Sequence, residues 1–263
     1  MTRRRTFVLS MLPRCGASLL ALGLVTTVGT VSGEQVNQPS ERDAGRIRRS
    51  APPDSVARQR FLEMFARAYF PGRTSQLLIV PREGDFITRP DPNFGYMHGS
   101  PWSYDVSIPL MFAGPAVKTG VFSAPAAQQD VAPTLAASLG VQMPPTATGR
   151  VLPVLRRGFA RPRVVMLLVL DGMRRDYFDR YAASMPTLTA LRQQGAWFTQ
   201  ARVNVLPSNT AVGHSTVSTG ADPRVHGITG VNVYDRTRGQ RHDLFSGGVP
   251  HDLMALTLAD VWQ

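Results

Sequence analysis

Apolar residues recur at helical spacing in several stretches of the chain. Between residues 55 and 68, one face carries Val56, Phe61, Met64, Phe65 and Ala68. Such spacing predicts an amphipathic helix, which Pro71-Gly72 would end. Three further helices are expected over residues 131–139, 187–194 and 210–219. The first of these has Asp130 as a candidate N-cap and Gly140 just past its end.

Continuous apolar runs predict strands at residues 76–80, 107–112, 164–170 and 197–205. Residues 164–170 are all apolar and lead into Asp171-Gly172, which is typical of a parallel strand buried on both faces. Strands that alternate with helices predict an α/β fold with a mostly parallel sheet flanked by helices. A carboxylate at the carboxyl end of such a strand lies where α/β sheets place their active sites.

The N-terminus has the pattern of an export signal. Arg3, Arg4 and Arg5 precede an apolar run at about residues 17–31, and small residues follow at 32–33. Residues 1–33 are therefore predicted to be a signal peptide, of the general or the twin-arginine type, and residues 34–54 a flexible linker. This predicts a periplasmic or secreted protein with no transmembrane segment once the signal is removed.

Composition narrows the possible partners. The net charge of +11 favours anionic partners such as phosphoesters, although a generally Arg-rich composition would give the same charge. No basic tract is interleaved with aromatic residues, so specific nucleic-acid binding is not expected. The single cysteine, Cys15, lies in the leader and excludes a disulfide or thiolate metal site within one mature chain.

Three residues are candidates for chemistry, and each also has a simpler interpretation. Asp171 is a possible oxygen ligand for a divalent cation, or else the start of an Asp-Gly turn. Thr210 precedes a helical pattern and could be a nucleophile near anion-binding backbone N–H groups, or else an N-cap. His98, in a long Gly- and Pro-rich loop, is a possible imidazole ligand or an exposed histidine. His214 and His226 are candidates for structural roles.

Together these segments resemble the alkaline phosphatase superfamily, in particular the branch with a threonine nucleophile that includes nucleotide pyrophosphatase/phosphodiesterases. Segments that resemble the N-terminal part of the family domain are residues 164–172, 185–191, 195–198, 209–214, 218–220 and 225–228. Segments that resemble its C-terminal part are residues 71–73, 98–105, 108–112, 130–135 and 149–150. The two parts, residues 163–263 and 55–157, thus stand in inverted order, and the resemblance implies an incomplete alkaline phosphatase-like fold.

The resemblance implies a site with two zinc ions. Thr210 would be the nucleophile, Asp171 and Thr210 would bind one ion, and His98 would bind the other. The family asparagine that holds a phosphoryl oxygen falls at Val231, and its neighbour Asn232 is the candidate for this role. The remaining family ligands have no convincing counterpart.

The function expected from the resemblance is hydrolysis of a small phosphoester through a phospho-threonine intermediate. No Cys or Ser stands in the sequence context of a sulfatase nucleophile, which speaks against that class. Two accounts fit the inverted order. The chain is the front part of a circularly permuted enzyme whose middle section would follow Gln263, or it is a rearranged, catalytically inactive module that binds anions. A weaker alternative is association with anionic lipid surfaces.

Overall fold

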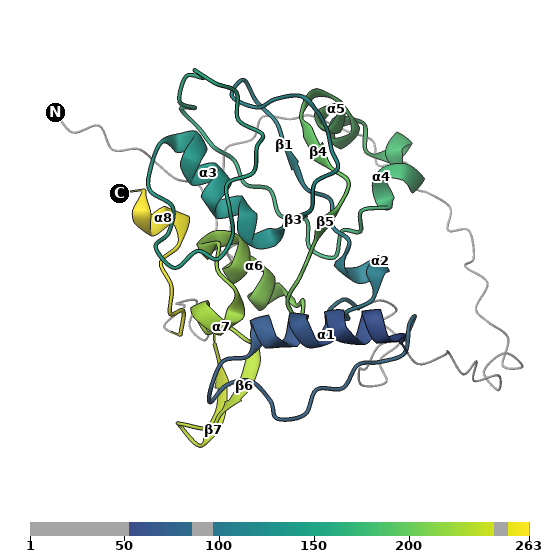
Figure 1. The fold of residues 1–263 in the computed structure, drawn as a ribbon, viewed down its shortest axis with the longest axis vertical. Coiled ribbons are helices and arrows are strands. Elements are labelled where there is room, and N and C mark those ends of the chain that lie inside the picture. The colour runs from purple at the N-terminus through teal and green to yellow at the C-terminus, as the bar shows by residue number, and fades with distance from the viewer. Residues whose placement is uncertain (1–52, 86–96, 245–251, 263) are drawn as a thin grey trace, which may run out of the picture. The chain divides into compact units, whose positions relative to one another are not determined.

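A computed structural model describes residues 53–85, 97–244 and 252–262, and these residues belong to one compact unit, Pro52–Gln263 (Figure 1). The predicted signal peptide and the linker up to residue 52 lie outside the described residues. None of the helices in the described ranges has the length and apolar character that crossing a bilayer requires.

The helices follow the sequence prediction closely. The longer ones are α1 (Ser55–Ala68), α3 (Val131–Leu139), α5 (Pro186–Gln194) and α6 (Thr210–Thr219). Asp54 caps α1 by accepting a hydrogen bond from the Ala57 N–H at 2.7 Å, and Gly140 ends α3 in the left-handed conformation. Short helices join them: α2 (Ser103–Val106), α4 (Tyr177–Arg180), α7 (Pro223–His226) and α8 (Leu258–Val261).

Asp130 occupies the predicted N-cap position of α3, but its side chain has another role. Its carboxylate accepts hydrogen bonds from the backbone N–H groups of Ala127 and Arg150, both at 2.9 Å. The side chain therefore fixes the turn before α3 to a distant segment and makes no capping bond to the helix.

In the described ranges the strands are short and form three small sheets, which confirms the α/β class. One sheet has the order β1 (Met111–Phe112), β4 (Ala196–Phe198), β2 (Gly120–Phe122). β4 pairs parallel with β2 and antiparallel with β1. The second sheet pairs β3 (Ala126–Ala127) parallel with β5 (Ala201–Arg202), and the third is the antiparallel hairpin of β6 (Asn232–Asp235) and β7 (Gln240–Asp243).

Two predicted strands do not form. Residues 76–80 and 164–170 have no regular secondary structure, and most of their side chains are exposed, Val164 by 80% and Met166 by 81%. The predicted burial of these two segments is therefore wrong for the described structure. An apolar run is buried only where neighbouring strands cover both of its faces, and the described residues supply no such neighbours. The run over residues 197–205 is likewise divided into β4 and β5, and 107–112 is reduced to β1.

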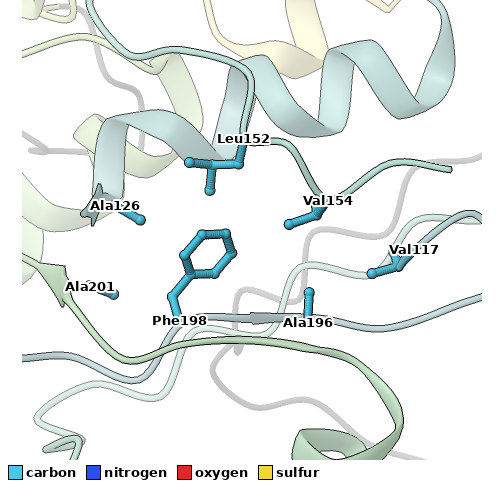
Figure 2. Packing of buried hydrophobic residues seen from close by; sticks show 7 residues of the cluster. All are labelled: Val117, Ala126, Leu152, Val154, Ala196, Phe198 and Ala201. Carbon is cyan, nitrogen blue, oxygen red and sulfur yellow. The ribbon is translucent and has the colours of Figure 1, made fainter. Parts of the chain in front are cut away.

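The main core joins the two predicted segments of the chain. Phe198 of β4 is fully buried, and its ring stacks on Phe122 of β2 at a centroid distance of 5.3 Å. Figure 2 shows this ring pointing toward Leu152, with Val154 beside it. A second cluster packs Met64 of α1 against residues that precede and begin α6: Val203, Val205, Leu206 and Val212. These contacts fix the segment that leads into Thr210.

Candidate active site

Thr210 is the first residue of α6, and its neighbour Asn209 caps the helix. The Asn209 Oδ1 atom accepts a hydrogen bond from the Val212 N–H at 3.2 Å, and its backbone carbonyl accepts from the Gly213 N–H at 2.8 Å. The simpler interpretation of Thr210 as the N-cap is therefore wrong. Because Asn209 does the capping, the exposed Thr210 hydroxyl is available to a partner outside the helix.

That partner is Asp171. The Thr210 hydroxyl donates to Asp171 Oδ2 at 2.9 Å, and His98 Nε2 lies 3.3 Å from Asp171 Oδ1. Asp171 also begins the turn that was its simpler interpretation: Gly172 has φ of +68°, and the Met173 N–H donates to the Leu170 carbonyl at 3.3 Å. The Asp171 carboxylate thus brings together Thr210 and His98, two residues that lie far apart in the sequence.

Backbone contacts orient His98. Its Nδ1 lies 2.9 Å from the Ser208 carbonyl, which can only accept, so Nδ1 carries a proton. The loop that holds His98 is closed by Asp105 of α2, whose Oδ2 accepts from the N–H groups of Gly99 and Ser100 at 2.9 and 2.6 Å. Sequence reasoning did not identify Asp105 or Ser208 as supports. The only signal was Asp105 itself, a carboxylate a few residues after a Gly-Ser pair.

Asn232, the fourth predicted site residue, does not share the polar contacts that join the other three among the described residues. It begins β6, is exposed, and pairs with Asp243 across the hairpin. In the described part of the chain no hydrogen bond or ion pair joins it to Thr210, Asp171 or His98. Its role in holding a phosphoryl oxygen stays a prediction.

His214 and His226 have structural contacts, as the sequence suggested. His214 Nδ1 lies 2.8 Å from the Thr210 carbonyl, one turn back along α6. His226 is fully buried: its Nδ1 accepts from the Ile228 N–H and its Nε2 contacts Thr216 Oγ1, both at 3.1 Å. Burial lowers the pKa of His226 from 6.5 to about 4, so the ring is neutral.

Asp222 and His226 have the spacing of a metal-binding pair, but they bind different partners. Pro223 occupies the first turn of α7, where its missing N–H costs nothing. Asp222 accepts from Gln129 Nε2 at 3.2 Å, and burial raises its pKa. Within the described ranges, no group of three or more His, Cys, Asp or Glu side chains could hold a metal ion.

Comparison with known proteins shows a family match over the second part of the chain. Residues 165–262 match the family model described as type I phosphodiesterase / nucleotide pyrophosphatase. Alkaline phosphatase PafA of Elizabethkingia meningoseptica is 34% identical over 82 residues, 30% of this chain and 15% of that protein. Venom phosphodiesterase 2 of Crotalus adamanteus is 35% identical over 71 residues, 27% of this chain and 9% of that protein.

A mammalian relative is similar over a stretch of about the same length. Ectonucleotide pyrophosphatase/phosphodiesterase family member 3 of Rattus norvegicus is 32% identical over 83 residues, which is 32% of this chain and 9% of that protein. The chain therefore matches only a small part of the length of these relatives, and no solved structure matches it significantly. Residues 165–262 thus match the type I phosphodiesterase / nucleotide pyrophosphatase family, and this match and the similar relatives support membership of the alkaline phosphatase superfamily.

Proposed function

We propose that this protein hydrolyses small phosphoesters with Thr210 as the nucleophile. The observation that carries the proposal is a hydrogen bond of 2.9 Å. The hydroxyl of Thr210, the first residue of α6, donates it to Asp171 Oδ2. The family match and the phosphodiesterases and phosphatases among the relatives support the reaction class.

The residues suggest the following chemistry. Thr210 Oγ attacks phosphorus while Asp171 Oδ2 accepts its proton, the bond from phosphorus to the leaving oxygen breaks, and that oxygen takes a proton from water. Water then hydrolyses the phospho-threonine and restores the hydroxyl. The N-terminus of the ten-residue helix α6 places a positive dipole end beside the phosphoryl oxygens. His98 holds Asp171 from its other oxygen and keeps Oδ2 toward Thr210.

The two-zinc site of the family does not fit the described residues. Three donor groups meet: the Asp171 carboxylate, His98 Nε2 and the Thr210 hydroxyl. Because His98 Nδ1 donates to Ser208, Nε2 is the ring nitrogen that faces the Asp171 carboxylate, and a proton or one cation between Nε2 and Oδ1 would hold the two groups together. One ion there would supply positive charge near the reacting oxygens, and a second ion has no ligand group in the described ranges.

A second candidate function is anion binding without turnover. It is favoured by the incomplete ligand set and by the net charge of +11. Export to the periplasm or the medium, proposed from the pattern of residues 1–33, is compatible with either function. So is the inverted order of the two family segments.

Steady-state hydrolysis of p-nitrophenyl phosphate and bis-p-nitrophenyl phosphate, with and without added zinc, tests the proposal. Thr210→Ala should lower kcat by at least about 100-fold. The matched control is Thr187→Ala: Thr187 is exposed in the first turn of α5, and its hydroxyl has no hydrogen-bond partner in the described ranges. Full activity in Thr210→Ala would refute the nucleophile, and phosphate binding with no turnover by the parent protein would favour the second candidate.

A further inference from the structure

Residues 164–170 form an apolar segment that pairs with no strand in the described part of the chain. All seven side chains are apolar, and six of them are exposed on what would be both faces of a strand. In the described part of the chain, the backbone N–H and C=O groups of residues 164–169 make no backbone hydrogen bond to another segment. A segment that is both apolar and unpaired is a template for strand addition.

The ends of this segment limit where a strand could form. Pro162 lacks an N–H to donate to a ladder, and Gly172 turns the chain with φ of +68°. Pairing is therefore confined to residues 163–171. Arg163 at one end is exposed and has no ion pair in the described ranges, and Asp171 at the other end is the carboxylate of the candidate site.

The segment is complementary to itself in one antiparallel register. Arg163 and Asp171 each stand four residues from Leu167. If Leu167 faces Leu167 of a second copy, Arg163 of each copy lies directly opposite Asp171 of the other, and every position between them is apolar. Directly opposite residues in an antiparallel pair have Cα atoms about 4.5–5.5 Å apart, which is within ion-pair reach for arginine.

We propose that two copies of this chain pair through residues 163–171 as antiparallel strands, and that each copy places its Arg163 beside Asp171 of the other. Two such ion pairs arise by the two-fold symmetry. Since Asp171 also accepts from Thr210, each guanidinium enters the site of the other copy, where it can bind a phosphoryl oxygen. This last step rests on the proposed function, but the pairing does not.

The second exposed apolar segment, residues 76–80, provides a control. Leu77 and Ile79 are exposed by 76% and 71%, so general stickiness would involve this segment as much as residues 164–170. It lacks the symmetric charged ends, because Ser75 precedes it and Pro81 follows it.

Sedimentation velocity over a range of concentrations tests the pairing without any substrate. The full chain should show a reversible monomer–dimer equilibrium. Leu167→Lys, which places like charges opposite each other at the two-fold axis, should weaken dimerisation at least about ten-fold. Arg163→Asp, which faces Asp171 with a second carboxylate, should also weaken it. Leu77→Lys should leave it unchanged, and circular dichroism should show that all variants are folded.

Mixing two variants that should each have little activity alone tests the arginine in trans. In an equimolar mixture of Arg163→Ala and Thr210→Ala chains, half of the dimers are mixed, and one of their two sites has both groups. Activity should recover to about a quarter of that of the parent protein. A monomer at all concentrations, or aggregation that Leu77→Lys reduces as much as Leu167→Lys, would overturn the pairing. Dimers with no hydrolysis in any mixture would refute the proposed function and leave the pairing intact.

Discussion

The buried imidazole of His226 should make the stability of the folded chain depend on pH. In the unfolded chain this group has its ordinary pKa of 6.5, and burial lowers the pKa in the folded chain to about 4. Between these values the unfolded state binds a proton that the folded state does not. The contribution of His226 to stability is therefore fully present above pH 6.5 and is lost as the pH falls through 4.

The size of the effect follows from the two pKa values. One pKa unit corresponds to about 1.4 kcal/mol, so lowering the pH from 7.5 to 4.5 should reduce the free energy of unfolding by about 2.5 kcal/mol through this group alone. Solvent does not reach the ring in the folded chain, because it is fully buried and contacts Thr216 of α6 on one side and the Ile228 N–H on the other.

The assay is urea unfolding of the parent protein and of His226→Gln at pH 7.5 and 4.5. The variant is expected to be less stable at pH 7.5, since it loses ring packing, but to lose about 2.5 kcal/mol less than the parent on acidification. The difference between the two proteins removes the contribution of the carboxylates to the pH dependence, because they titrate in both. His214→Gln, at an exposed position of α6, should behave as the parent does. An equal loss in His226→Gln and the parent would refute the reasoning.

Three further changes test the core around Phe198, the end of α6 and the loop that carries His98. Phe198→Ala should lower the free energy of unfolding by about 3–5 kcal/mol in urea titration, because the ring is fully buried at the centre of the core, whereas Val121→Ala at an exposed position should have little effect. Gly220→Ala should reduce the melting temperature, because Gly220 has φ of +69° and an added Cβ would lie 2.8 Å from Pro133 Cδ. Asp105→Ala should lower kcat with little change in the melting temperature, since it frees the loop that carries His98.

The helices were predictable from sequence because their signals are local. The spacing of Phe61 and Met64, the cap at Asp54 and the stop at Gly140 act within a few residues of each helix. The strands were less predictable, because an apolar run shows only that a segment would gain from burial. Whether residues 164–170 are buried depends on neighbouring strands that could lie anywhere in the sequence, and the described residues do not include them.

Sequence similarity and structure contributed different parts of the site. The resemblance selected Thr210, Asp171 and His98 as residues of one site, and the structure places them around the Asp171 carboxylate. The assignment of the cap to Asn209 could have been made locally, since asparagine is a strong N-cap. The support of His98 by the Ser208 carbonyl could not, because a backbone acceptor leaves no signal in the residue type.

The contacts between residues 55–157 and residues 163–263 are compatible with the inverted order that the resemblance predicts for these two segments. β2 and β3, from the first segment, pair in parallel with β4 and β5, from the second. Parallel pairing requires a crossover but not a particular order of the strands along the chain, so the same pairs are available in either order. The buried bond from Gln129 to Asp222 and the shared cluster around Phe198 reinforce the same junction. The same core contacts would thus be available in either order of the two segments, and α6, with Thr210 at its start, packs against residues of both.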